Sequence, residues 1–119
     1  MMKIVYSPES RHDLRNIRKY VKKEFGEDVE KRTMSYITTH IRTLGKHSKL
    51  GRDLSQIVPI ICDYKYLYIR QNYVFYRIEG NHIRIIRVLN EKQDFMQILF
   101  GLNTTSEESE KYWNDDPTV

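Results

Sequence analysis

The sequence predicts one α+β domain in which two helices pack on one face of a small antiparallel sheet. Its 119 residues are close to the size of a single domain, about 150 residues. Two stretches with helical spacing of apolar residues lie near the start, and three stretches rich in aromatic and β-branched residues follow them. This segregation of helices and strands along the chain is typical of an α+β fold.

A short strand is expected at residues 3–7, followed by an antiparallel helical hairpin. Ser7 and Pro8 form a helix start, because serine is a favoured N-cap and proline is favoured at the first helical position. The first helix continues to Gly26, and the second covers residues 28–46. The apolar stripes are Leu14, Ile17, Val21 and Phe25 in the first helix, and Val29, Thr33, Tyr36, Ile37, Ile41 and Leu44 in the second.

A three-stranded antiparallel meander and a short C-terminal helix complete the predicted fold. Gly80-Asn81 is a two-residue hairpin signal between the last two strands, and Arg70-Gln71-Asn72 can form the turn before them. The predicted elements are a loop at residues 49–63, strands at 64–69, 73–79 and 82–89, and a helical segment at 95–100 that ends at Gly101.

Alternation along the last two strands assigns their side chains to the two faces of the sheet. One face is expected to cover the helices, and the other is aromatic and basic and is a candidate surface for a ligand. The middle strand separates Tyr73, Phe75 and Arg77 from Val74, Tyr76 and Ile78. The last strand separates Arg84, Ile86 and Val88 from Ile83, Ile85, Arg87 and Leu89.

The composition excludes several classes of protein and site. There is no run of about 18 apolar residues, and residues 1–10 lack the apolar core of a signal peptide, so we expect a cytoplasmic protein without membrane contact. Cys62 is the only cysteine, which excludes an internal disulfide and a zinc site built from cysteines. The four histidines lack metal-binding spacing and the five glycines form no nucleotide-binding motif, so no metal and no cofactor are expected.

The charge of the chain is unevenly distributed. Between Asn103 and Val119, five acidic side chains and one lysine give a net charge of −4, and since the whole chain carries +4, the preceding residues carry +8. Such a body is expected to attract a polyanion or an acidic partner. The face of the first helix opposite its apolar stripe is either a solvated surface or a contact for nucleic acid or an acidic protein. It carries Arg11, Arg15, Arg18, Lys19, Lys22 and Lys23.

Several short motifs occur in order between residues 3 and 101. They are Tyr6-Ser7-Pro8-Glu9 with Asp13-Leu14, Leu50-Gly51-Arg52, the strand from Asn72 to Ile78, and Ile85-Ile86-Arg87-Val88-Leu89 with Asp94. Together they resemble the RelE/ParE superfamily of toxins from bacterial type II toxin–antitoxin systems. The resemblance implies a RelE/ParE-like fold for a toxin domain at residues 1–102, followed by an acidic tail at residues 103–119.

The resemblance also implies a partner and two alternative activities. ParE-like toxins inhibit DNA gyrase by binding it, whereas RelE-like toxins are metal-independent endoribonucleases that cut mRNA on the ribosome. Both are neutralised by a cognate antitoxin whose C-terminal segment wraps around the toxin. The expected antitoxin is acidic and has a DNA-binding N-terminal region such as a ribbon-helix-helix. Since both activities use one fold, the fold does not choose between them.

The residues at the RelE-like catalytic positions favour gyrase inhibition. RelE-like toxins carry an arginine three residues before the strand tyrosine, and that position before Tyr76 is Tyr73. Met96-Gln97-Ile98 stands where those toxins have a catalytic tyrosine or histidine, and Asn90 stands where many relatives have a histidine. The long predicted hairpin, residues 8–46, is also typical of ParE-like toxins. The endoribonuclease is kept as the alternative.

The candidate site residues are basic and aromatic. Those for binding the antitoxin or the target are Lys65, Arg70, Tyr73, Phe75, Arg77, Arg87, Lys92 and Phe95, and those for the nuclease alternative are Arg70, Tyr73, Arg77, Arg87 and Lys92. A structural interpretation competes with these roles, with Arg87 and Asp94 as an ion pair and Tyr73 and Tyr76 as packing aromatics. In the tail, Trp113 is expected to pack back on the basic body.

Overall fold

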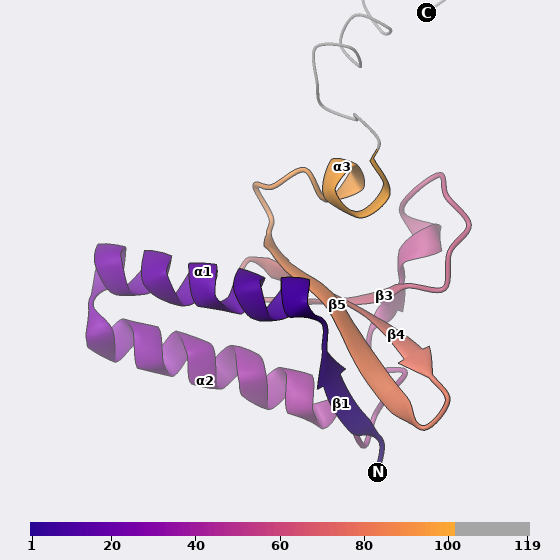
Figure 1. Ribbon diagram of the computed structural model, residues 1–119, viewed down its shortest axis with the longest axis horizontal. Helices are drawn as coiled ribbons and strands as arrows, with labels where there is room; N and C mark the ends of the chain where they lie inside the picture. The colour runs from indigo at the N-terminus through magenta and orange to yellow at the C-terminus, as the bar shows by residue number, and fades with distance from the viewer. Residues whose placement is uncertain (102–119) are drawn as a thin grey trace, which may run out of the picture.

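A computed structural model describes residues 1–101 as a five-stranded sheet with helices on both faces (Figure 1). The helical hairpin covers one face, and the short last helix packs against the other, where no helix was expected. The elements are β1 (Lys3–Tyr6), α1 (Pro8–Phe25), α2 (Glu27–Thr43), β2 (Arg52–Asp53), a 3-10 helix (Leu54–Gln56), β3 (Lys65–Ile69), β4 (Asn72–Glu79), β5 (His82–Asn90) and α3 (Phe95–Phe100). The predicted tail, its boundary and the packing of Trp113 lie outside the described residues.

The sheet adds one short strand to each edge of the predicted meander. Its order is β1-β5-β4-β3-β2, and all neighbours are antiparallel except β1 and β5. The prediction that residues 49–63 form only a loop was wrong, because this segment contains β2 and the 3-10 helix. β2 pairs with β3 at two positions only, and so short a strand cannot display a period of alternation.

The predicted start of the helical hairpin is confirmed. The Ser7 hydroxyl accepts a hydrogen bond from the Ser10 N–H at 2.9 Å, and Pro8 occupies the first helical position. Gly26 alone joins the two helices: its N–H donates to the Lys22 carbonyl, and its own carbonyl accepts from the Glu30 N–H. Gly26 has a φ of +93°, which explains the glycine at this position. α2 ends three residues earlier than expected, at Thr43.

Both hairpin turns of the meander lie where the sequence predicts them. Gly80 has a φ of +60° and precedes Asn81 in the turn between β4 and β5. In the turn between β3 and β4, Arg70 and Gln71 have φ values of +52° and +66°. Positive φ at both central residues is the geometry that matches the twist of two paired strands, although it is uncommon without glycine.

A β-bulge changes the alternation of β5. Phe75 of β4 pairs with Arg87, whereas the next residue, Tyr76, pairs with Ile85, so Ile86 is the extra residue. Val88 therefore packs on the hairpin face, with Ile85, and Leu89 packs on the opposite face, with Phe75. The predicted faces of Val88 and Leu89 were wrong, because one extra residue reverses every later side chain of a strand.

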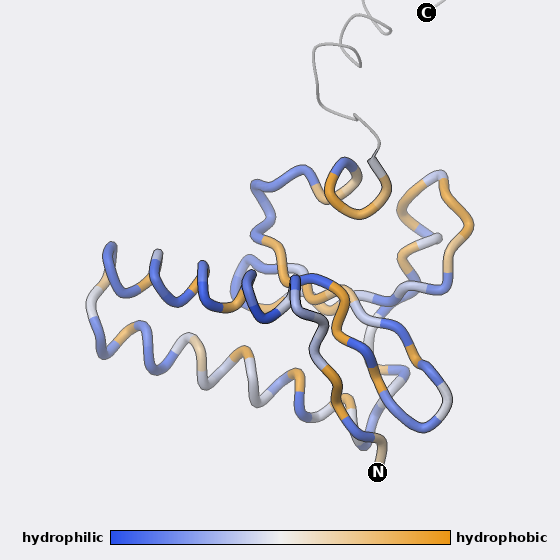
Figure 2. The backbone as a smooth tube through the Cα atoms, in the orientation of Figure 1, coloured by the Kyte–Doolittle hydropathy of each residue, from blue (hydrophilic) through white to orange (hydrophobic). Residues whose placement is uncertain are grey.

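The two faces of the sheet bury separate hydrophobic cores. The core below the hairpin contains Ile37, Ile41, Leu44, Ile69, Val74, Tyr76, Ile83, Ile85 and Val88. The core on the other face contains Leu54, Val58, Phe75, Leu89 and Met96. Figure 2 shows hydrophobic residues gathered in α3 and in the segment after the 3-10 helix, the two elements that close this second core.

Tyr76 ties the sheet to the chain that leaves the hairpin. Its ring is fully buried, and its hydroxyl donates to the Ser48 carbonyl at 2.8 Å and accepts from the Gly51 N–H at 2.9 Å. A Cβ atom at Gly51 would lie 2.6 Å from this hydroxyl oxygen and 2.7 Å from the Tyr66 carbonyl, so only glycine fits there. Burial raises the pKa of Tyr76, which keeps the hydroxyl protonated and able to donate.

We expect Tyr76→Phe to destabilise the fold by about 2 kcal/mol, because the buried Gly51 N–H and Ser48 carbonyl lose their partner. Urea unfolding measures this change. Tyr20→Phe removes a hydroxyl from a side chain that is 61% exposed and serves as the matched control. Equal stability of the two variants would contradict a structural role for the buried hydroxyl.

Candidate functional site

A groove of about 830 Å³ separates the helical hairpin from the loops at one end of the sheet. We call it the hairpin groove. The hairpin extends past the sheet at its Gly26 end, so its apolar side chains there have no strand to cover them (Figure 1). The groove is lined by Asp13, Asn16, Ile17, Tyr20, Val21 and Phe25 of α1, Val29 and Thr33 of α2, Arg70, Gln71 and Asn72 of the first turn, and Val88 with residues 90–93.

Two exposed aromatic rings form the apolar wall of the hairpin groove. Tyr20 is 61% exposed and Phe25 is 60% exposed, and their rings meet edge to face with centroids 6.4 Å apart. The sequence assigned Phe25 to the buried stripe, which was wrong because the sheet does not reach this end of α1. An exposed apolar patch with a polar rim is typical of a protein-binding site.

The opposite wall is polar and is fixed by hydrogen bonds between two loops. The Gln71 carbonyl accepts from the Glu91 N–H at 2.9 Å and from the Asn90 side chain at 3.3 Å. The side-chain amide of the buried Asn72 donates to the Arg70 carbonyl at 2.9 Å and so stabilises the left-handed turn.

Two cations, Arg70 and Lys92, line the hairpin groove on this polar wall. The Arg70 guanidinium lies 4.0 Å from the centre of the Tyr36 ring on α2, so its position relative to the hairpin is fixed. The groove therefore combines an apolar wall with a cationic rim.

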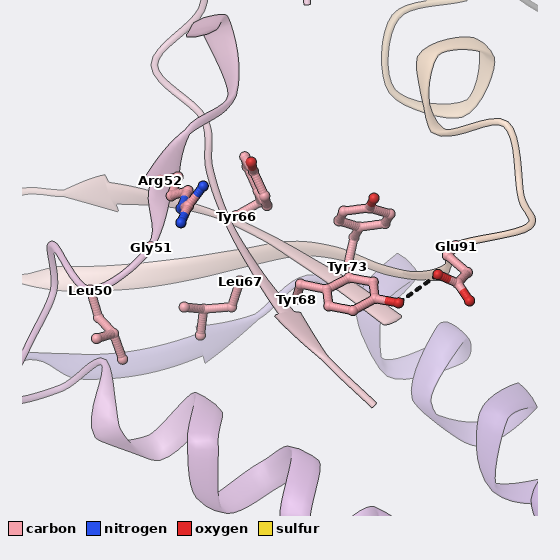
Figure 3. Close-up of a pocket in the computed structure, with 8 residues that line it drawn as sticks. All are labelled: Leu50, Gly51, Arg52, Tyr66, Leu67, Tyr68, Tyr73 and Glu91. Carbon is pink, nitrogen blue, oxygen red and sulfur yellow. Dashed lines mark hydrogen bonds between the residues drawn. The ribbon is translucent and has the colours of Figure 1, made fainter. Parts of the chain in front are cut away.

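A second, smaller hollow of about 500 Å³ lies over the β3 edge of the sheet (Figure 3). Figure 3 shows Tyr66, Tyr68 and Tyr73 beside it, with the Tyr68 hydroxyl donating to the Glu91 carboxylate. This hydrogen bond is the main reason that the pKa of Tyr68 is raised. The hollow is adjacent to the hairpin groove, because Glu91 lines both.

Tyr73, Phe75 and Phe95, three of the predicted binding residues, belong to one aromatic cluster. The Tyr73 ring centre lies 5.8 Å from that of Phe75 and 5.4 Å from that of Phe95, and Tyr66 and Tyr68 pack at 5.9 and 5.2 Å. Phe75 is fully buried. The cluster joins β3, β4 and α3, so its rings act at least as packing groups.

The structure separates the other predicted residues instead of bringing them to one centre. Arg70 and Lys92 share the hairpin groove. Lys65 forms an ion pair with Asp53 at 2.6 Å, across the β2–β3 pair. Arg77 binds the Glu79 carboxylate on the same strand, and Arg87 binds the carboxylate of Asp13 on α1.

Arg87 is bound by Asp13 of α1. Its Nε lies 2.7 Å from one carboxylate oxygen and its Nη2 lies 2.9 Å from the other, and the Val88 N–H also donates to this carboxylate at 2.9 Å. These bonds to Asp13 raise the pKa of Arg87. The expected ion pair between Arg87 and Asp94 was wrong, because Arg87 pairs with Asp13 instead. Asp94 caps α3 by accepting a hydrogen bond from the Gln97 N–H.

A cluster that the sequence did not predict surrounds Glu79, and we call it the Glu79 cluster. The Glu79 carboxylate accepts from Arg77 at 2.8 Å, from Arg84 at 2.9 Å and lies 3.2 Å from His82. The hydrogen bond from Arg84, followed by those from His82 and Arg77, lowers the pKa of Glu79 against the opposing effect of burial. Alternation along β4 assigned Arg77 to the correct face of the sheet. The meeting of Arg77, His82 and Arg84 at Glu79 depends on the hairpin pairing of β4 with β5.

Two further observations concern sites and membrane contact. Within residues 1–101, no three histidine, cysteine, aspartate or glutamate side chains are close enough together to bind a metal ion. None of the described helices has the length and apolar character of a membrane span.

Several solved structures share this fold. A chain of the chromosomal ParDE toxin–antitoxin system from P. aeruginosa superposes with a TM-score of 0.64 at 18% identity, covering 76% of this chain and 96% of that chain. The YoeB dimer from Staphylococcus aureus matches with a TM-score of 0.51 at 19% identity, covering 74% of this chain and 94% of that chain. Among curated proteins, no significant sequence match was found.

The family is established by a sequence model. The model of the ParE toxin of the type II toxin–antitoxin system parDE matches residues 4–95. The chain is therefore a type II toxin of the RelE/ParE superfamily. Within that superfamily it belongs to the ParE toxin family, which confirms the resemblance and the predicted fold.

We expect Asp13→Ala to destabilise the protein by about 3 kcal/mol, since it leaves Arg87 and the Val88 N–H without their shared partner. Asp63→Ala removes a carboxylate that is 73% exposed and 3.8 Å from Arg77, so we expect a loss below about 1 kcal/mol. Chemical denaturation of both variants measures the difference. Similar losses would show that Asp13 contributes no more than a surface carboxylate.

The Glu79 cluster predicts a dependence of stability on pH. Because the folded pKa of Glu79 lies below its ordinary value, the cluster stabilises the protein above the unfolded pKa, about 4.3, and this contribution is lost as pH falls through the folded pKa. We therefore expect Glu79→Gln to be less stable than the native chain at pH 7, and this difference in stability should become smaller towards pH 3. Urea midpoints at the two pH values test this, with Glu24→Gln as a control for the loss of one carboxylate. The same difference in stability at pH 3 as at pH 7 would contradict a stabilising role for the Glu79 cluster.

Proposed function

We propose that this toxin inhibits DNA gyrase by binding it and is neutralised by a cognate acidic antitoxin that occupies the hairpin groove. The observation that carries the proposal is the pairing of two exposed aromatic rings, Tyr20 and Phe25, with the cations Arg70 and Lys92 across one groove. Aromatic anchors with a charged rim are the arrangement through which proteins bind other proteins.

The dimensions of the hairpin groove suit a short amphipathic helix. From Asn16 to Phe25 the groove follows α1 for about 14 Å, which equals two to three turns of a bound helix. Apolar residues of such a helix would contact Tyr20 and Phe25, and its acidic residues would lie near Arg70 and Lys92. The net charge of +8 on residues 1–102 would speed association with an acidic partner. The match to a ParDE toxin–antitoxin system supports a cognate antitoxin as the partner.

Gyrase inhibition is favoured over RNA cleavage by what the candidate catalytic residues do. Cleavage requires an acid, a base and a positive charge near one phosphate. Arg87 is held by Asp13, Tyr73 is packed among aromatic rings, and neither of them lines the groove that contains Arg70 and Lys92. The match to the ParE family model also favours this target.

The Glu79 cluster is the observation that favours the endoribonuclease as a second candidate. It places an imidazole, a carboxylate and two guanidinium groups within one set of contacts, so proton transfer and phosphate binding have the required groups there. The fold likeness to YoeB is compatible with either activity, because the superfamily shares one fold.

We expect Tyr20→Ala with Phe25→Ala to weaken binding of the antitoxin encoded beside the toxin gene by at least about 30-fold. Loss of a buried aromatic anchor typically costs 2 kcal/mol or more in binding, or about 30-fold in Kd. Isothermal titration measures the change. Ile61→Ala, at a side chain that is fully exposed and outside the groove, is the control. Native affinity in the double variant would place the antitoxin elsewhere.

For the target, we expect the purified toxin to block supercoiling by purified gyrase, and induced cells to form filaments while bulk translation continues. Cleavage of ribosome-bound mRNA with intact supercoiling would overturn gyrase as the target. In that case Arg77→Ala should reduce cleavage at least about tenfold, the effect of losing one charge contact worth ~1.4 kcal/mol in the transition state.

A further inference from the structure

We infer that the outer face of α1 is a binding surface for the phosphate backbone of double-stranded DNA. We call this surface the basic ridge. Its residues are all exposed, and none of them lines the hairpin groove. The basic ridge consists of Arg11, Arg15, Arg18, Lys19, Lys22 and Lys23.

Within residues 1–101, the basic ridge has almost no compensating negative charge. Between Ser10 and Lys23 the only acidic residue is Asp13, which is buried and bound to Arg87. Among the described residues, one cation of the ridge, Arg18, has an ion-pair contact, at 3.7 Å from Glu30 of α2, and its side chain is still 59% exposed. The positive field of the ridge therefore reaches solvent.

The spacing of the cations makes the ridge a regular row. Arg11, Arg15, Arg18 and Lys22 follow one another at four, three and four residues, which places them along one line of the helix, and Lys19 and Lys23 flank that line. At 1.5 Å per residue, the row from Arg11 to Lys22 is about 17 Å long.

The pattern opposes the stability of the helix. Like charges four residues apart repel each other, and the ridge contains several such pairs, for example Arg15 with Lys19. α2 shows the alternative, because Lys31 lies 3.7 Å from Glu27, its partner four residues earlier. A polyanion bound along the ridge would offset the repulsion.

The composition of the ridge indicates duplex DNA more than a protein or a single strand. Protein interfaces bury an apolar centre, and the ridge contains no apolar side chain. Single-stranded nucleic acids are held largely by stacking on aromatic rings, which the ridge also lacks. Duplex DNA presents about one negative charge per 1.7 Å of its axis, which suits a straight row of cations. Since the contacts would be to phosphates, binding is expected to be independent of base sequence.

The position of the ridge allows two partners at once. The hairpin groove and the basic ridge lie on different faces of the same helix. The α1 residues of each set recur every three or four positions, and the two sets are offset along the sequence. A protein in the groove would leave the ridge open to DNA. This inference is independent of whether gyrase or the ribosome is the target of the toxin.

The test is fluorescence anisotropy of a labelled 30-base-pair duplex of mixed sequence, titrated with the full chain between 50 and 200 mM KCl. Six phosphate contacts predict that log K falls with log salt at a slope of about −5, or about a thousandfold over this range. The triple variant Arg15→Gln, Lys19→Gln, Lys22→Gln is expected to halve the slope, to a loss of about 40-fold. At 50 mM KCl it should bind at least about tenfold more weakly than the native chain.

The matched control removes the same number of charges away from the ridge, with Arg32→Gln, Lys46→Gln and Lys49→Gln, which are all exposed. It should keep the native slope, and thermal melting checks that both triple variants are folded. Equal losses in the two variants would mean that only net charge matters and would overturn the ridge as the site. An unchanged slope in the ridge variant, or tighter binding to single-stranded DNA or duplex RNA than to duplex DNA, would also overturn it.

Discussion

Where β1 ends, the backbone edge of β5 needs new hydrogen-bond partners, and the first turns of α1 supply them. The Ser7 N–H donates to the Ile85 carbonyl at 3.0 Å, and the Ser7 hydroxyl donates to the Ile86 carbonyl at 2.7 Å. Two turns later the Asp13 carboxylate accepts from the Val88 N–H. These contacts fix the direction in which α1 leaves the sheet, and with it the overhang of the hairpin. The groove and the exposed face of α1 both depend on this direction.

The same junction decides which charged groups are available for function. Asp13 binds Arg87 with two hydrogen bonds, so Arg87, a candidate site residue in the sequence, stabilises the fold instead. At the far end of the β4–β5 hairpin, Glu79 holds Arg77, His82 and Arg84 together. Among the described residues, the exposed cations that these carboxylates do not bind include Arg70 and Lys92 at the rim of the groove and the row along α1. The hairpin thus presents an apolar face with a cationic rim at the groove and a basic face along the outer side of α1.

The sequence was sufficient for features that depend on a few neighbouring residues. Ser7-Pro8 and Gly80-Asn81 predicted a helix start and a turn, because capping and positive φ are local requirements. Ile86 could not be predicted as a bulge, because a bulge depends on how β5 pairs with β4 and no local sequence pattern indicates it. The candidate site was predicted only in part. Arg70 and Lys92 do share a groove, but Tyr20 and Phe25 were missed as its wall, because their exposure depends on where the sheet stops.

The single-residue link at Gly26 has a consequence for recognition at the groove. Two helices of 18 and 17 residues are joined by one glycine, which leaves no loop in which the hairpin could open or slide. The aromatic wall therefore sits on a stiff support before any partner arrives, and little conformational entropy of the toxin would be lost on binding. Most of the conformational entropy lost on binding would therefore be lost by the partner. A disordered antitoxin segment could fold against this end of the hairpin, with the toxin acting as a preformed template.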